Sequence, residues 1–321
     1  MAVSPPPSAA DNLRGGVWML FSVVNASAMT VAARWVSEGM DSRMIVFLRA
    51  VLTLVAAAPL LASPAVRARL SFSRPWLHLL RGGLIGVSTQ FGFHAIANLP
   101  LATVTVLFFT APIFATLLAV PINGERVGPR RLAAVLTGFL GALVLLRPGV
   151  GGVAPDQLWA MIGALVSSLM FALALALSRG LAEADGAASA FVSSVAATVL
   201  VSAPLALPVW SLPADPLAWT ALIVLIASGS ARGFADIEAY RLGEASVVGV
   251  IAYLRLVLIG AAGWLLFAET PDAATWAGGA IIIGATLYIA RRERQLRAAT
   301  RPRKTCAAPS PAAGAAGHRK G

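Results

Sequence analysis

The chain has 321 residues, of which 58% are hydrophobic and only 12% are charged, and its mean hydropathy is +0.79. Soluble domains carry about 25% charged residues, so this composition excludes an ordinary soluble enzyme and favours a protein that faces lipid. The net charge of +11 comes largely from arginines and lysines after residue 290. We interpret this basic tail as a membrane-retention signal that contacts anionic lipid heads, and not as a nucleic-acid site.

In chain order, apolar stretches recur that are long enough to cross a bilayer core as helices, which takes about 17–25 residues. Lipid offers no hydrogen-bond partner for a free backbone group, so we expect each stretch to be helical. The short connections leave no room for a soluble domain. We therefore predict an all-α integral membrane protein with ten transmembrane helices. The expected helices cover residues 15–34, 43–63, 76–96, 101–122, 130–147, 158–178, 187–208, 217–237, 245–267 and 273–290.

The arginines between these helices predict the orientation of the chain. If the N-terminus is cytoplasmic, the inner loops hold most of these arginines and the outer loops hold few, as the positive-inside rule requires. We expect an inner-membrane protein with both termini in the cytoplasm and with disordered tails at 1–14 and 291–321. The inner-loop arginines are then Arg67, Arg69, Arg74, Arg126, Arg130, Arg131, Arg179 and Arg241, and the outer-loop ones are Arg34, Arg43 and Arg147.

The sequence contains an internal repeat. The first expected helix ends in Arg34-Trp-Val-Ser-Glu38 and the sixth in Arg179-Gly-Leu-Ala-Glu183, so both close on Arg-x-x-x-Glu. Later, the segment from Ala102 to Glu125 aligns with the segment from Ala245 to Glu269. The nearly constant offset between these matches indicates two copies of one unit.

Each copy holds five helices, an odd number, so the second copy must enter the membrane upside down. The loop at 124–131 carries three arginines, whereas its counterpart at 268–276 carries acids and no arginine, as expected for loops on opposite faces. Residues 15–147 and 158–290 are thus predicted to be two inverted five-helix repeats. Inverted repeats are typical of secondary transporters, whose substrate site lies near the middle of the membrane.

The stretch from Ala95 to Gly149 resembles the EamA domain of the drug/metabolite transporter superfamily. The resemblance rests on Asn98-Leu-Pro-Leu-Ala102, Pro112, Gly124-Glu125-Arg126-Val127-Gly128-Pro129, Gly138-Phe-Leu-Gly141 and Arg147-Pro148-Gly149, and in the second copy on Ala245, Tyr253, Gly263, Phe267-Ala-Glu269, Pro271 and Gly278. It implies ten helices in two inverted halves that export or take up small metabolites, such as amino acids, purines or vitamins, without ATP. Arg255 stands where the first copy has Pro112, so this site need not bind what relatives with a proline bind.

Arg255 interrupts the apolar run of the expected ninth helix. A mid-membrane arginine costs about 3 kcal/mol on insertion scales, and each Leu, Ile, Val or Phe returns about 0.3–0.6 kcal/mol, so the helix can still insert. The charge nevertheless needs a partner or a wet cavity. We expect Arg255 and Tyr253 to face a central cavity and bind a substrate carboxylate or phosphate, because a guanidinium makes bidentate contacts with such groups. A structural ion pair with another helix is the alternative.

Further polar side chains share helix faces. Ser228, Arg232, Asp236 and Tyr240 recur every four residues in the eighth expected helix. Arg232 and Asp236 can simply pair with each other, or Asp236 can line the transport path and pair with Arg255.

The third expected helix carries a second stripe, Gln90, His94 and Asn98, which can line a cavity or join helices. His94 can change protonation near neutral pH and is a candidate for coupling transport to protons, with a helix-packing histidine as the alternative. We add Asn25 of the first helix to the substrate-binding candidates. Arg49 and Arg81 lie near helix ends, where snorkelling to the membrane boundary explains them.

Several chemistries are missing from the sequence. The only lysines are Lys304 and Lys320, so there is no P-loop, and neither HExxH nor GxSxG occurs. The single cysteine, Cys306, excludes an intrachain disulfide. We therefore expect no enzyme, cofactor or metal, and as partners the lipid bilayer, a small polar metabolite that is anionic or zwitterionic, and a proton or other ion for coupling. A non-transporting membrane protein is the alternative, and Asp236 next to His94 would favour an intramembrane enzyme over a sensor subunit.

Overall fold

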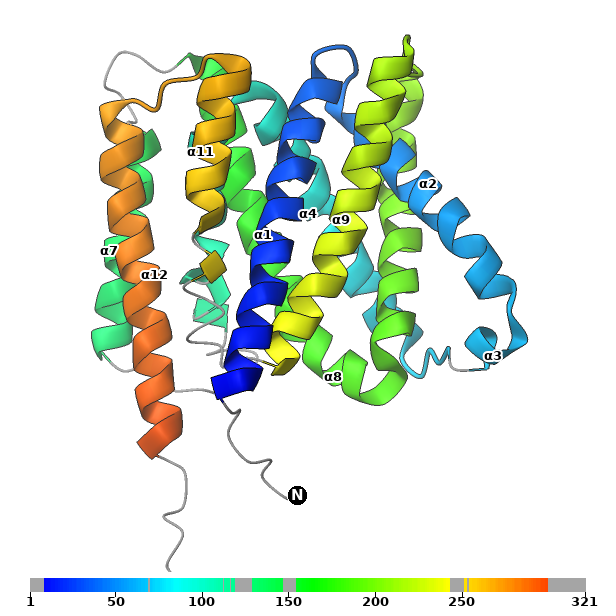
Figure 1. Ribbon diagram of the computed structural model, residues 1–321, viewed down its shortest axis with the longest axis horizontal. Coiled ribbons are helices and arrows are strands. Elements are labelled where there is room, and N and C mark those ends of the chain that lie inside the picture. The colour runs from blue at the N-terminus through cyan, green and yellow to red at the C-terminus, as the bar shows by residue number, and fades with distance from the viewer. Residues whose placement is uncertain are drawn as a thin grey trace, which may run out of the picture.

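The computed structural model describes residues 9–68, 70–111, 113–115, 117–118, 129–146, 154–242, 251–252 and 254–299, and every regular element in them is helical. The helices stand side by side with their ends at two opposite faces (Figure 1). We call the face where α1 begins and α12 ends the lower face, and the opposite one the upper face. The elements are α1 (Ala9–Ser37), α2 (Ser42–Ala62), α3 (Pro64–Arg67), α4 (Pro75–Asn98), α5 (Leu101–Phe108), α7 (Pro129–Leu146), α8 (Pro155–Ala206), the 3₁₀ helix η1 (Leu207–Val209), α9 (Pro216–Leu242), α11 (Leu254–Phe267) and α12 (Ala273–Ala299).

Within the described residues, five helical segments are long and apolar enough to cross a membrane. They are Leu13–Ser37, Ser42–Pro59, Pro155–Leu177, Ala188–Val209 and Pro216–Asp236. Shorter apolar helices occur at Leu101–Ala115, Ala133–Val144, Leu254–Phe267 and Ala273–Ala285. The predicted all-helical class is therefore confirmed, and the full set of ten spans stays a prediction.

Helix extends into both stretches that we expected to be disordered tails. α1 begins at Ala9, inside residues 1–14, and α12 continues to Ala299, inside residues 291–321. The extension of α12 reads RRERQLRAA, and arginine, glutamate, glutamine, leucine and alanine are all strong helix formers. Composition alone therefore does not mark where α1 begins and where α12 ends.

α8 is two helices joined at a sharp break. Gly186 has φ 81° and ψ 158°, a left-handed conformation that glycine adopts without a steric penalty. The first part of α8 descends from the upper to the lower face, and the second part returns (Figure 1). This hairpin matches the sixth and seventh expected helices, whose boundary we placed between residues 178 and 187.

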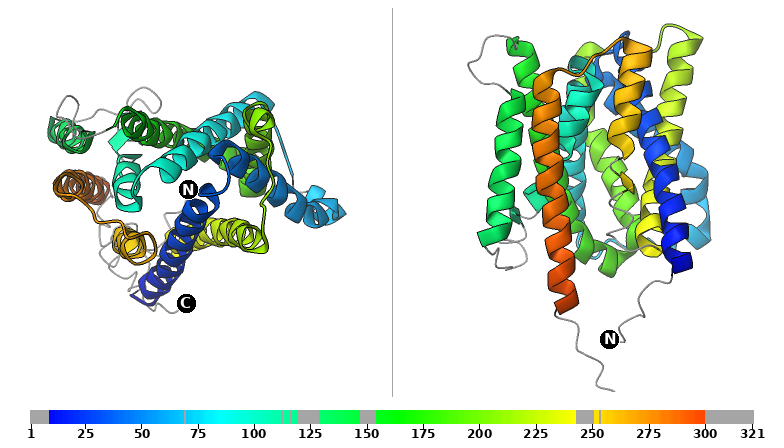
Figure 2. Two further views of the ribbon diagram at one scale, coloured as in Figure 1. Left: turned by 90° about the horizontal axis from the view of Figure 1, so that it is seen from above. Right: turned by 60° about the vertical axis from the view of Figure 1, so that its left-hand side comes forward.

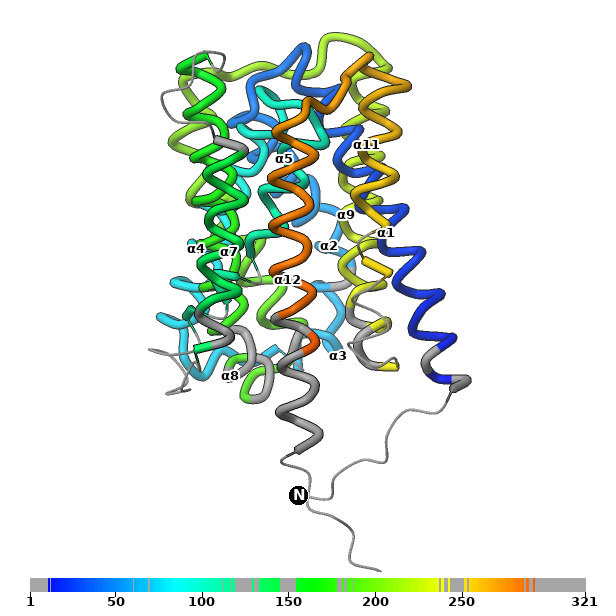
Figure 3. The backbone as a smooth tube through the Cα atoms, turned by 90° about the vertical axis from the view of Figure 1, so that its left-hand side faces the viewer, coloured from blue at the N-terminus to red at the C-terminus, as the bar shows by residue number. Residues whose placement is uncertain are grey.

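Three helix pairs make the most extensive contacts: α4 with α8, α1 with α9, and α7 with α12. Seen from above, α1 lies between α9 and α11 (Figure 2), and Figure 3 shows α7 and α12 running next to each other. Glycines permit the close approach, because a Cβ added at Gly82 would lie 2.6 Å from Cβ of Ala197, and one at Gly141 would lie 2.9 Å from Cβ of Ile281.

The outward surface is apolar. Trp159, Leu200, Val257 and Leu265 are each more than half exposed. A soluble protein rarely exposes so many large apolar side chains, whereas lipid tails are a suitable solvent for them.

Candidate functional site

Arg255 lies at the lower end of α11 and points its charge at α1. Its Nη2 donates to Oγ1 of Thr30 over 3.4 Å, and Thr30 is fully buried. Its Nε is buried and finds no hydrogen-bond acceptor among the described residues. No described carboxylate lies within ion-pair distance of Arg255, so the described residues do not form the structural ion pair that we considered as the alternative.

Asp236 of α9, the acid that we considered as a partner for Arg255, already has other partners. Ser22 of α1 donates its hydroxyl to Oδ1 of Asp236, and Nε of Arg232 lies 3.5 Å from Oδ2. The pairing of Arg232 with Asp236 one helical turn apart is therefore present. The charges of Arg232 and Asp236 both act on Arg255, which places the three groups in one electrostatic neighbourhood.

Arg49 joins this neighbourhood from α2. Its guanidinium carbon lies 5.7 Å from the centre of the Phe93 ring, and its Nη2 would lie 3.7 Å from a Cβ added at Gly229 of α9. The charge of Arg232 acts on Arg49 as well. Arg49 thus turns inward, which corrects our expectation that it snorkels to the membrane boundary.

We call Arg49, Arg232, Arg255 and Asp236 the central basic cluster. It brings together side chains of α2, α9 and α11, with hydroxyl groups of α1 beside them. The cluster contains three guanidinium groups and one carboxylate, so these four side chains carry an excess of positive charge. Such an excess in a mostly apolar surrounding attracts an anion.

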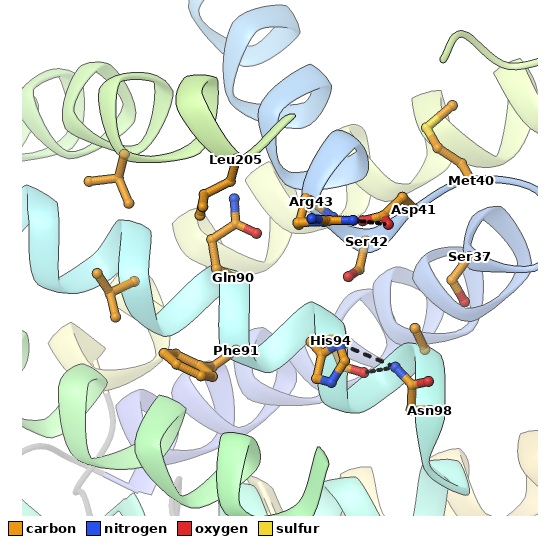
Figure 4. A pocket seen from close by; sticks show the side chains of 13 residues that line it. Ser37, Met40, Asp41, Ser42, Arg43, Gln90, Phe91, His94, Asn98 and Leu205 are labelled. Atoms are coloured by element: carbon orange, nitrogen blue, oxygen red, sulfur yellow. Dashed lines mark hydrogen bonds and ion pairs between the residues drawn. The ribbon is translucent and has the colours of Figure 1, made fainter. Parts of the chain in front are cut away.

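A pocket of about 660 Å³ lies elsewhere, near the upper face between the α1–α2 connection, α4 and the second part of α8. Gln90 and His94 of α4 line it together with Asp41 and Arg43 (Figure 4). Nε and Nη2 of Arg43 lie 2.9 and 2.7 Å from the carboxylate of Asp41, and these hydrogen bonds lower the pKa of Asp41. Gln90 and His94 therefore share a face as predicted, but that face lines this upper pocket and not the central basic cluster.

The remaining candidates have local partners or fall outside the description. The side chain of Asn25 donates to the carbonyl oxygen of Phe21 in its own helix over 2.8 Å. Nδ2 of Asn98 donates to the carbonyl oxygen of His94 over 2.8 Å. Tyr253 lies outside the described residues, as does Pro112 of the first repeat.

The histidine–acid pair of the enzyme alternative is not formed by His94 and Asp236. His94 lies in the upper pocket, whereas Asp236 bonds to Ser22 of α1. Among the described residues, no group of three or more histidine, cysteine, aspartate or glutamate side chains could hold a metal ion.

A different histidine–acid pair does exist at the lower end of α4. Nε2 of His78 lies 3.0 Å from Oδ2 of Asp185, and its Nδ1 lies 2.9 Å from Oγ of Ser193. The hydroxyls of Ser71 and Ser73 donate to the same carboxylate over 2.7 and 2.9 Å. The hydrogen bond from His78, followed by those from the serines, lowers the pKa of Asp185.

This cluster contains a serine, a histidine and an aspartate, the residue types of a hydrolase triad, but it is closed to a substrate. The side chains of His78 and Asp185 are 3% and 0% exposed, so no substrate reaches them in this conformation. The cluster ties the segment before α4 to the break in α8. Arg81 belongs to the same contact, because its Nη1 donates to the Ala190 carbonyl oxygen and to Ser194, so snorkelling does not describe it either.

A bundle of apolar helices with a charged cluster inside defines a multi-pass α-helical membrane protein. The EamA-like transporter family matches the chain twice, at residues 13–147 and 158–291. The chain therefore belongs to the EamA-like transporter family, as its resemblance predicted.

Curated relatives align over nearly their whole length. The chain is 29% identical to an S-adenosylmethionine uptake transporter of Rickettsia prowazekii over 283 residues, which cover 88% of this chain and 94% of the relative. It is 30% identical to a riboflavin transporter of Brucella anthropi over 271 residues, with 83% and 95% covered. A pseudopaline exporter of Pseudomonas aeruginosa is 27% identical, with 88% and 99% covered. A solved structure at 22% identity shares the fold, with a TM-score of 0.54 and coverage of 90% of this chain and 99% of that one.

Proposed function

We propose that this small-molecule transporter is a secondary carrier of the inner membrane, and that its substrate is a small polar metabolite with a carboxylate or phosphate group. The observation that carries the substrate class is Arg255, a charged group inside the bundle whose described contact is a single hydroxyl. A cation in such a place needs an opposite charge. A substrate anion supplies it and gains bidentate hydrogen bonds in return.

Two observations support alternating access between inverted repeats. α1 rises from the lower to the upper face, whereas the first part of α8, its counterpart in the second family match, descends (Figure 1). The extensive contact between α1 and α9 has its counterpart in the contact between α8 and α4, with the roles of the two halves exchanged. The ten-helix arrangement is part of this proposal, and rocking of one half against the other would move the substrate without ATP.

We assign the lower face to the cytoplasm. Among the described residues, the exposed arginines Arg14, Arg67 and Arg74 lie at helix ends or connections on that face, whereas the exposed Arg43 lies at the upper face beside Asp41. This distribution follows the positive-inside rule. Both termini would then be cytoplasmic.

The substrate can be found by a measurement that covers many small metabolites at once. Untargeted metabolomics of cells and medium, with and without overexpression of the chain, should reveal an acidic or zwitterionic metabolite whose distribution across the membrane changes. Cells that express Arg255→Ala to the same membrane level serve as the matched control. A change that is confined to uncharged metabolites would contradict the proposed substrate class.

Arg49 should contribute to affinity. Replacing it with glutamine removes one positive charge of the central basic cluster, and we expect KM for the substrate to rise about tenfold, the lower end of the range for a charge-assisted hydrogen bond. Uptake kinetics in vesicles measure this. The matched control is Arg67→Gln, an exposed arginine at the lower face, for which KM should stay at the parental value. An unchanged KM for Arg49→Gln would remove Arg49 from the site.

A further inference from the structure

An ion pair joins the two family-matched halves at the upper face. Arg34 lies in the last turn of α1, and its Nη2 is 3.6 Å from Oε1 of Glu269, in the connection between α11 and α12. Nη1 of Arg34 donates to the carbonyl oxygens of Ile96 and Ala97, at the end of α4, over 3.0 and 2.6 Å. Oε2 of Glu269 accepts the backbone N–H of Leu101, at the start of α5, over 2.7 Å. These two side chains thus hold four helix ends together.

The pair lies directly above the central basic cluster. On α1, Arg34 is one helical turn above Thr30, which contacts Arg255. On the other side, α11 rises from Arg255 to Phe267 and leads straight into Glu269. The ring of Phe267 lies 6.0 Å from the guanidinium carbon of Arg34. A substrate that leaves the cluster toward the upper face between α1 and α11 would therefore meet this pair.

The contact is incompletely satisfied. Nε of Arg34 and Oε1 of Glu269 are buried and find no hydrogen-bond partner among the described residues. Burial raises the pKa of Glu269, although the Leu101 N–H and Arg34 oppose this change. Ala268, next to it, has φ 52°, a left-handed conformation that is strained for a residue with a Cβ. A partly satisfied, strained contact is easier to open than a fully bonded one.

We propose that Arg34 and Glu269 form the outer gate of the transport path. When they are paired, the upper ends of α1, α4 and α5 are held to the α11–α12 connection and the path is closed at this face. Their separation releases the second half from the first and opens the central basic cluster to the outside. The assignment of this face to the outside rests on the proposed function, whereas the gate itself can be tested without any substrate.

The test measures access from outside to a cysteine below the gate. Thr30 lies one helical turn below Arg34, contacts Arg255 and is fully buried, so it lies beneath the proposed gate. With Cys306→Ser to remove the native thiol, Thr30→Cys is the reporter. Intact cells are treated with a membrane-impermeant maleimide, and the labelling rate is read from the mass shift of the protein.

Arg34→Gln leaves Glu269 as a buried charge without its partner, so we expect the reporter to label about tenfold faster. Adding Glu269→Gln removes that buried charge, so the double variant should label more slowly than Arg34→Gln but still faster than the parent, because the ion pair is missing in both. Glu38→Gln, an exposed acid on the same face, is the matched control and should change nothing. Arg34→Lys keeps the positive charge but loses the bidentate geometry of the guanidinium, so the reporter should label at an intermediate rate. This variant tests the gate even if Arg34→Gln folds poorly.

Parental labelling rates in both Arg34→Gln and Arg34→Lys would overturn the gate, and so would an equal acceleration by Glu38→Gln. Acceleration that is seen only in inside-out vesicles would place the gate at the cytoplasmic face and contradict its assignment as the outer one. A working gate in a chain that moves no metabolite would instead refute the proposed function alone.

Discussion

Arg255→Ala is expected to lower the initial rate of substrate uptake by about 30-fold, the size of one strong charge-assisted contact of about 2 kcal/mol, without lowering the amount of protein in the membrane. The variant keeps the apolar helix and removes the guanidinium that we assign to the substrate anion. Arg255→Lys should retain part of the rate, because it keeps the charge and loses the bidentate geometry. Uptake into vesicles, normalised to the amount of inserted protein, measures both.

Arg14→Gln is the matched control, since Arg14 is an exposed arginine at the lower end of α1, away from the central basic cluster. It should transport at the parental rate. If Arg255→Ala also transports at the parental rate, Arg255 is structural and the assigned binding site is wrong.

Asp185→Ala should cause a large loss of thermal stability. It leaves His78 without its acceptor in a buried site and releases Ser71 and Ser73 from the break in α8. The thermal unfolding temperature in detergent should fall by several degrees, and by less for Asp185→Asn, which keeps one acceptor oxygen. Asp156→Asn, an exposed acid in the first turn of α8, is the control. Equal unfolding temperatures for all variants would contradict a structural role for this cluster.

The same cluster predicts how stability depends on pH. The pKa of Asp185 is lower in the folded protein than in the unfolded chain, so the folded state holds its proton less tightly. The stabilisation is therefore complete above the unfolded value of about 4 and disappears as the pH falls through the lower, folded pKa. The difference in thermal unfolding temperature between the parent and Asp185→Asn should consequently shrink as the pH falls below about 4.

Much of the helical framework could be predicted from apolar length alone. α1, α2, α9 and both parts of α8 lie where long apolar stretches predict them, because the bilayer fixes the length of a spanning helix. Arg255 was visible as a charge within an apolar run, and the spacing of Arg232 and Asp236 predicted their contact. These features depend only on neighbours within one helix.

The partners across helices could not be predicted in this way. Ser22 and Thr30 are small hydroxyl residues of a kind common in apolar helices, and only the packing of α1 reveals that they bond to Asp236 and Arg255. Periodicity predicts that Gln90 and His94 share one face of α4, but it does not reveal which part of the bundle that face meets.

Position near a helix end likewise fits both an arginine that snorkels and one that turns inward, which is why Arg49 was misjudged. His78 and Asp185 are far apart in the sequence, and no local pattern joins them.

The central claim is that the cluster around Arg255 recognises the anionic group of a transported metabolite. It is tested most directly in proteoliposomes without ATP, by comparing entry of the acid found by metabolomics with entry of its uncharged amide. We predict that the acid enters, that the amide does not, and that Arg255→Ala abolishes the difference. Equal entry of the acid and the amide through the parent protein would contradict the claim.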